Sequence, residues 1–159
     1  MAAALHARGH RLVTDDVAVL RVEEGFTTMF PGFPQLKLWP KALVSLGEDP
    51  EELSRCNPHF EKRSRPAAHK FSSTPVPVKR IYVLDKGDTP EILPLGPKEA
   101  LGELVHHTYG ALGVGSASHF LECARLANEV AICSLRRRKS LSQLPDLARL
   151  IEADLVRNA

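Results

Sequence analysis

The chain has 159 residues, of which 43% are hydrophobic and 25% are charged, and its formal net charge is +2. This length predicts one domain with a sizeable core, and this composition excludes collagen, a coiled-coil rod and a wholly disordered chain. The near-neutral charge and the 6% aromatic content predict no nucleic-acid partner, and no apolar run reaches the roughly 18 residues of a membrane span.

The first 47 residues predict a short helix followed by strands that turn back on one another. Gly9 supplies a helix cap, and Glu23-Glu24-Gly25 supplies a turn between two strands. The expected elements are a helix over 1–7, strands over 12–13, 17–22 and 26–30, a loop over 31–34, and an edge strand from 35 with a short helix from Pro40.

Residues 48–75 are expected to form a long basic loop with one helical turn at most. The segment from Arg55 to Arg80 contains seven Lys or Arg residues and one acidic residue, and its prolines would interrupt any regular helix. Long loops in compact domains are usually functional or disordered. A strand is expected to follow over 76–84.

The remainder of the chain predicts helices around one strand. Helices are expected to begin at Pro97, with Glu99 in a capping position, at Ser116 and at Pro145, with a break over 110–115 and a strand over 130–135. The apolar spacing assigns two helix faces to the core, namely Ala117, Phe120, Leu121, Ala124 and Ala127 in the second helix and Leu147, Ala148, Ile151 and Leu155 in the last. The order of elements predicts a single α/β or α+β layered domain over 1–159.

The strongest local signal for chemistry is the acidic pair Asp15-Asp16 after the short apolar stretch Leu12-Val13. One carboxylate at the end of a strand can hold Mg²⁺, and the other can take a proton from an attacking hydroxyl. Such a pair after a strand is more often only a turn, so the pattern alone leaves both interpretations open.

The longer stretch Arg8-Gly9-His10-Arg11-Leu12-Val13-Thr14-Asp15-Asp16 resembles the HPr kinase/phosphorylase family. There, Arg-Gly-His-Arg-Leu-Val-x-Asp-Asp follows the phosphate-binding loop and its helix, and eight of the nine positions agree. Looser similarity to bacterial serine kinase homologues runs through residues 36–40, 75–84 and 95–100. The resemblance implies an α/β nucleotide-binding core like that of HPr kinase and phosphoenolpyruvate carboxykinase, N-terminally truncated and with C-terminal helices.

The resemblance also implies the function and the site. It implies an ATP- and Mg²⁺-dependent kinase that transfers phosphate to a serine of a protein or peptide, with Asp15 and Asp16 as catalytic base and metal ligand in an order left open. Alternatives are a degenerate binding protein on the same scaffold and a small-molecule kinase. Lys70, Lys79 and Arg80 are candidates to clamp nucleotide phosphates, although a basic run is usually a solvated face.

Two departures from the family pattern stand out. The chain contains no Gly-Lys-Ser phosphate loop, which the resemblance would place just upstream of Met1, so the bare chain is expected to be inactive. The family's Glu-x-Arg-Gly-like stretch corresponds here to residues 29–34, which contain no acid, and this weakens the expectation of a second metal ligand and of a phosphorylase reaction.

Other residues have a simpler expected role. His10 is expected to be structural, Trp39 to fill the core, and Arg136-Arg137-Arg138-Lys139 to form a solvated turn, with a nucleotide or partner contact as the alternative for this basic run. Three cysteines without metal-ligand spacing, and a first segment without a signal-peptide pattern, predict reduced thiols in a cytoplasmic protein. The expected partner is a peptide or protein with an acceptor serine, and a homo-oligomer is possible.

Overall fold

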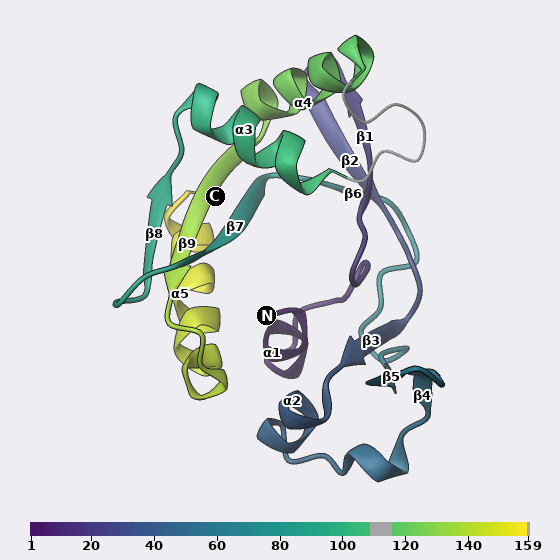
Figure 1. Cartoon of the computed structure of the whole chain (residues 1–159). Helices are drawn as coiled ribbons and strands as arrows, with labels where there is room; N and C mark the ends of the chain where they lie inside the picture. Colours follow the sequence, from purple (N-terminus) through teal and green to yellow (C-terminus); the bar gives the residue numbers. More distant parts are fainter. Residues whose placement is uncertain (109–115, 159) are drawn as a thin grey trace.

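The protein, described here as a computed structural model over residues 1–108 and 116–158, has a mixed α/β fold with three small sheets (Figure 1). The helices of the described residues are α1 (Ala2–Ala7), α2 (Pro40–Ser45), α3 (Pro97–His107), α4 (Ala117–Glu129) and α5 (Leu144–Arg157), with 3₁₀ turns η1 (Pro50–Glu52) and η2 (Leu141–Gln143). The strands are β1 (Val19–Glu23), β2 (Phe26–Phe30), β3 (Gln35–Leu38), β4 (Arg55–Asn57), β5 (Phe60–Pro66), β6 (Val76–Pro77), β7 (Arg80–Lys86), β8 (Glu91–Pro94) and β9 (Ala131–Arg137).

The first sheet has the strand order β1-β2-β6 and is antiparallel. The predicted hairpin is confirmed, with Glu23 paired to Phe26 and Gly25 at a φ of +84°, a backbone conformation that favours glycine. The single strand predicted over 76–84 is wrong. The chain instead forms β6, which ends at Pro77 where no N–H can continue the ladder, and then β7 in a different sheet.

The second sheet, with strand order β3-β5-β4, replaces much of the basic loop predicted over 48–75. Two arginine side chains of β5 form ion pairs with carboxylates from the segment before it. Arg63, which is buried, donates to Glu51 at 2.5 Å, and Arg65 donates to Glu48 at 2.7 Å. The loop prediction failed because the basic residues were counted without the acids that pair with them.

The third sheet has the order β7-β9-β8, with β7 parallel and β8 antiparallel to β9. Successive residues of β7 and β9 face opposite sides: Ile132 joins the cluster under α3 and α4, whereas Leu135 packs against α5. Among the described strands this is the one parallel pair, so the mixed α/β class is confirmed while the extended parallel sheet expected of a nucleotide-binding core is not observed.

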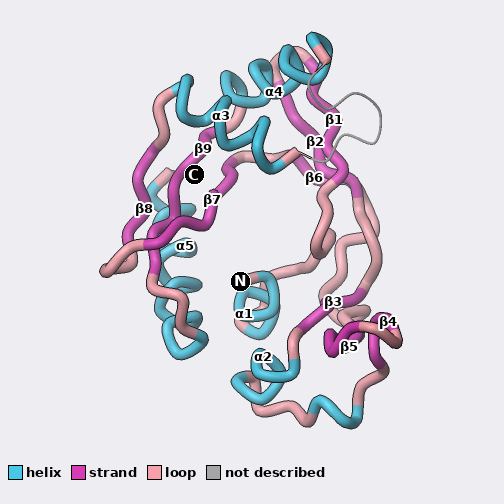
Figure 2. Tube along the Cα trace, viewed as in Figure 1, coloured by secondary structure: helices cyan, strands magenta, loops and turns pink. Residues whose placement is uncertain are grey.

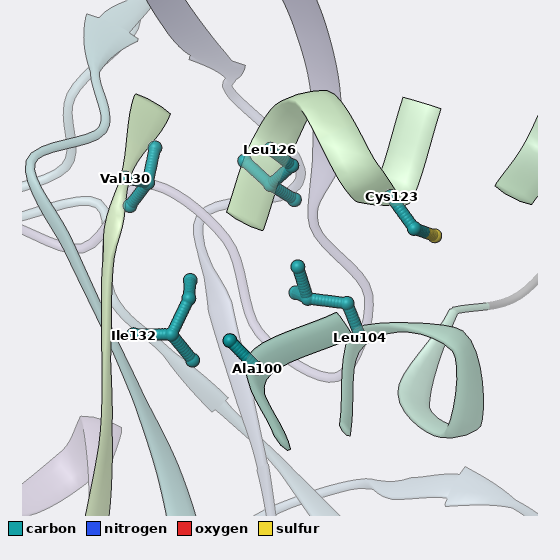
Figure 3. Close-up of a cluster of buried hydrophobic side chains, with 6 residues drawn as sticks. All are labelled: Ala100, Leu104, Cys123, Leu126, Val130 and Ile132. Atoms are coloured by element: carbon teal, nitrogen blue, oxygen red, sulfur yellow. The ribbon is translucent and has the colours of Figure 1, made fainter. Parts of the chain in front are cut away.

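The core beneath α3 and α4 is a cluster of six buried residues, drawn in Figure 3: Ala100, Leu104, Cys123, Leu126, Val130 and Ile132. The face predicted for α4 holds for Ala127, which packs against this cluster, but is wrong for Ala117, Phe120 and Leu121, which are exposed. In α5 the prediction holds for Leu147, Ala148 and Ile151 but not for Leu155, which is exposed. The predicted break over 110–115 lies outside the described residues.

Helix α1 connects the two remaining core clusters and lies near the centre of Figure 1. Its Ala3 packs with Leu12 and Leu36, while Met1 and Leu5 pack against the cluster of β9 and α5. As predicted, the helix ends before Gly9, whose φ is +106°. Figure 2 shows that loops join the β3-β5-β4 sheet to the rest of the chain. None of the helices in the described ranges has the length and apolarity needed to cross a membrane.

Candidate functional site

The acidic pair lies in a loop rather than at the end of a regular strand. Leu12 forms only an isolated parallel bridge with Phe71: its N–H donates to Lys70 O at 2.8 Å, and Ser72 N–H donates to Leu12 O at 2.7 Å. The strand predicted over 12–13 is therefore reduced to one bridge. That bridge nevertheless fixes where the acidic loop begins, because Leu12 is buried among Ala3, Leu36 and Ala67.

The two carboxylates of the loop have different surroundings. Asp15 is half-buried, and its Oδ2 accepts a hydrogen bond from the backbone N–H of Lys37 at 2.7 Å. Asp16 has a left-handed backbone with a φ of +62°, and its side chain is 38% exposed. Asp16 Oδ2 lies 3.4 Å from Lys37 Nζ, and Oδ1 lies 3.7 Å from Lys62 Nζ. One acid thus anchors the loop to β3, and the other faces solvent between two ammonium groups.

The segment that the resemblance aligns with the family's acidic stretch does lie beside this loop. Gly32 N–H donates to Val13 O at 2.9 Å, and Thr14 Oγ1 donates to Val17 O at 2.7 Å. A Cβ on Gly32 would overlap the Thr14 hydroxyl, so only glycine allows the two segments to come this close. At this point residues 29–34 present backbone and the neighbouring Thr14 hydroxyl to the acidic loop, and no acidic side chain.

Lys37 and Lys62 complete the site and were not among the predicted residues. They come from β3 and β5, which are neighbours in the sheet through the ladder that pairs Lys37 with Ser64. The Lys62 ammonium also lies 5.9 Å from the centre of the Trp39 ring. Trp39 is 53% exposed, so its expected role as a core residue is wrong. We call Asp15, Asp16, Lys37, Lys62 and Trp39 the acidic-loop site.

The three basic residues predicted to clamp phosphate are placed differently from one another. Lys70 is tied to the loop by its carbonyl, and its Nζ would lie 3.4 Å from a Cβ on Gly9. Lys79 is exposed between β6 and β7. Arg80 instead donates to Asp154 Oδ2 at 2.7 Å, and its side chain is only 16% exposed. Of the three, Lys70 is the residue that the structure joins to the segment leading into Asp15 and Asp16.

His10 and Arg8 form an ion-paired cluster with Glu152 of α5. Arg8 donates to both carboxylate oxygens at 2.8 and 2.6 Å, and the His10 ring lies 2.8 Å from Oε1. The hydrogen bond from Arg8 and then the one from His10 lower the pKa of Glu152 to about 2. This contact attaches the segment before the acidic loop to α5, which agrees with the structural role expected for His10.

The donors of the acidic-loop site suit a metal that a ligand brings with it. In the part of the chain that the structure describes, no group of three or more His, Cys, Asp or Glu side chains is arranged to hold a metal ion. Asp15 Oδ1 has no hydrogen-bond partner among the described residues, and Asp16 is reachable from solvent. Mg²⁺ typically takes one or two carboxylates from the protein and its other ligands from water and phosphate, so Asp15 and Asp16 could supply the protein's share of such a ligand set.

Comparison of the chain with protein-family models, with curated proteins and with solved structures finds no match.

Proposed function

We propose that this chain carries the acidic-loop part of a serine kinase-like phosphotransferase that uses ATP and Mg²⁺, with a protein or peptide serine as acceptor. A Gly-Lys-Ser phosphate loop is not among its 159 residues, so the bare chain is expected to be inactive. The observation that carries the proposal is the stretch Arg8–Asp16, which combines the family's residue pattern with two carboxylates held in distinct surroundings. Phosphoryl transfer needs little covalent chemistry from the protein, and catalysis comes from positioning and charge stabilisation. Two carboxylates can divide the tasks of such a site, one holding the metal and the other accepting the proton of the attacking hydroxyl.

The geometry favours one assignment of roles. Asp16 is exposed on a loop, so an incoming serine hydroxyl can reach it and give up a proton to it. Asp15 is fixed by the Lys37 N–H and keeps Oδ1 available, which suits a stationary ligand for a metal. When bound, Mg²⁺ would neutralise charge on the transferring phosphate. Lys37, Lys62 and Lys70 would supply positive charge for phosphate oxygens.

A second function, that of a non-catalytic binding protein on the same scaffold, is favoured by a specific observation. Both oxygens of Asp16 face ammonium groups, and residues 29–34 supply no acid beside the loop. In this alternative the lysines neutralise the acidic pair permanently, and the loop is a structural turn. The two functions differ in whether the carboxylates matter for phosphate transfer or only for folding.

The test is radiolabelled phosphate transfer from ATP to serine peptides by the full-length gene product across a series of Mg²⁺ concentrations. We expect Asp16→Asn to lower the transfer rate by about 10² or more with little change in ATP binding, in line with typical acid–base contributions. Asp15→Asn should lower the rate and also raise the Mg²⁺ requirement. Asp146→Asn, a change at an exposed acid of α5, is the matched control and should leave the rate unchanged.

Near-parental rates in both loop variants at every Mg²⁺ concentration would rule out the kinase proposal and favour the binding protein. Binding can be followed separately, because Trp39 is the single tryptophan and lies beside Lys62. A change in its fluorescence on addition of Mg²⁺ and ATP, present in the parent and in Asp16→Asn, would show that a loss of rate is a loss of chemistry rather than of binding.

A further inference from the structure

A second charged site lies at the carboxyl ends of the parallel strands β7 and β9. The two strands end side by side, with Lys86 paired to Arg137, and Gly87 N–H donates to Arg137 O at 3.1 Å. A hollow of about 340 Å³ lies here, lined by Lys86, Gly87, Asp88, Arg137, Arg138 and Lys139. In open α/β sheets, ligands commonly bind beyond the carboxyl ends of the strands.

The lining of this hollow is strongly cationic and weakly compensated. It brings together four basic side chains and one carboxylate, that of Asp88. In the described part of the chain, none of these four cations lies within ion-pair distance of a carboxylate, whereas the neighbouring Arg136 pairs with Glu91 at 3.3 Å and Asp85 at 3.8 Å. Four clustered cations with one carboxylate among them leave a net positive local field that attracts anions.

Arg137 carries a second indication of a missing partner. Its Nε is buried and, among the described residues, has no hydrogen-bond acceptor, and its Nη1 makes only a long bond of 3.4 Å to Arg138 O. A buried guanidinium N–H without an acceptor is costly, and such groups often mark the place of an ion or ligand. The planar guanidinium matches the spacing of phosphate oxygens better than any other side chain.

We propose that this hollow, the β7–β9 basic pocket, binds the phosphate group of a small phosphorylated ligand, with Arg137 as its central contact and Lys86, Arg138 and Lys139 around it. This pocket shares no lining residue with the acidic-loop site, and the proposal does not depend on the function proposed above. Arg136 and Arg137 lie in β9 rather than in the solvated turn expected from the sequence, and the proposal gives residues 137–139 a binding role. Gly87 supports the pocket, because a Cβ there would lie 2.9 Å from Cβ of Arg136 and would displace the strand ends.

The experiment is calorimetric titration of the full-length protein at fixed ionic strength with three probes: inorganic phosphate, phosphoserine and ATP without Mg²⁺. We expect inorganic phosphate to bind with a dissociation constant of about 1 mM or below. The phosphate chemistry is common to all three probes. Tighter binding of phosphoserine would identify a phosphorylated amino acid as the source of the phosphate, and tighter binding of ATP would identify a nucleotide.

Variants on the two sides of β9 make the test specific. Arg137→Gln should weaken phosphate binding about tenfold, which is the effect of losing one charge-assisted contact. Arg136→Gln removes the same charge from the opposite face of the strand, where Glu91 and Asp85 already pair with it, and should change affinity less than twofold. Asp88→Asn removes the one carboxylate of the lining and should strengthen binding about threefold.

Two further variants keep the test decisive. If Arg137→Gln does not fold, the exposed double change Arg138→Gln with Lys139→Gln should still weaken phosphate binding by about threefold to tenfold. Asp146→Asn should leave phosphate binding intact, because Asp146 is an exposed acid of α5 that belongs to neither proposed site. The proposal is overturned if no probe binds below about 10 mM, or if Arg136→Gln weakens binding as much as Arg137→Gln.

Discussion

Asp154 should be one of the most important polar residues for the stability of this fold. It lies on α5, and its Oδ2 accepts hydrogen bonds from Arg80 Nη1 and from the Tyr82 hydroxyl of β7, both at 2.7 Å. Asn158 Nδ2 donates to the other oxygen at 3.2 Å. The Arg80 and Asp154 side chains are only 16% and 14% exposed. This network attaches the last helix to the edge of the third sheet.

The expected cost of breaking the network follows from this burial. Exposed ion pairs contribute about 0–1 kcal/mol, and removing one partner of a fully buried pair costs about 3–5 kcal/mol. The burial of the Arg80–Asp154 pair lies between that of an exposed pair and that of a fully buried pair. Asp154→Ala removes the acceptor that Arg80 and Tyr82 share, and it should lower the free energy of unfolding by about 2 kcal/mol. Tyr82→Phe removes one neutral donor and should cost about 1 kcal/mol. For a chain of this size, Asp154→Ala should lower Tm by about 4–8 °C.

The assay is urea unfolding followed by far-ultraviolet circular dichroism, with a double-mutant cycle between Arg80→Ala and Asp154→Ala. Asp146→Ala on the same helix is the control, because Asp146 is well exposed and its one ion pair within residues 1–108 and 116–158 is with Arg149. The reasoning is refuted if Asp154→Ala costs no more than Asp146→Ala, or if the cycle gives no coupling energy. Arg80 would then be free for the phosphate contact predicted from the sequence, instead of the structural contact inferred here.

Three further outcomes are expected. Arg8 and His10 lower the pKa of Glu152 to about 2 from its ordinary 4.5. The contribution of Glu152 to stability should therefore be present above about pH 4.5 and lost as pH falls toward 2. Urea unfolding at a series of pH values should show that Glu152→Gln removes this pH dependence. Burial and the hydrogen bond to Asp154 raise the pKa of Tyr82. The stabilising effect of Tyr82 should therefore be complete below pH 10 and lost only as pH rises well above 10. Phenolate absorbance at alkaline pH should show one tyrosine that ionises only when the protein unfolds. Gly32→Ala should destabilise the protein by about 1–3 kcal/mol in thermal unfolding, through overlap with Thr14, whereas Gly102→Ala, where a Cβ meets nothing within 4 Å, should not.

The elements that the sequence predicted well are those determined by neighbouring residues. The turn at Gly25, the start of α3 at Pro97 and the cap of α4 at Ser116 each depend on residues a few positions apart. The Gly96 N–H donates a hydrogen bond to Glu99 Oε2 at 3.1 Å, and Ser116 Oγ accepts one from the His119 N–H at 3.2 Å, as local capping rules predict. Turn and capping hydrogen bonds join residues a few positions apart, so they can be predicted from the sequence alone.

The sheet arrangement could not be predicted in the same way. β5 was missed because its residues are basic, and its stability comes from pairing with β3 and from carboxylates such as Glu48 and Glu51 elsewhere in the chain. Strand propensity depends on these cross-strand neighbours more than on the residue itself. The face of α4 failed for a related reason, since apolar residues occur on more than one side of that helix and only packing selects Cys123 and Leu126.

The acidic-loop site likewise combines residues that the sequence predicts with residues that only the folded chain brings to them. Asp15 and Asp16 were identified from adjacent residues, whereas Lys37 and Lys62 reach them only through the β3–β5 ladder. On the proposed function these lysines have a consequence for the reaction. Exposed ion pairs of this kind are weak, so phosphate oxygens can draw Lys37 and Lys62 away from Asp16 at little cost. Binding of phosphate and release of the Asp16 carboxylate are then coupled, and the carboxylate becomes available to a serine hydroxyl only when a phosphate donor is in place. Movement of Lys62 would also take its charge from the Trp39 ring, so the fluorescence of Trp39 reports this step directly.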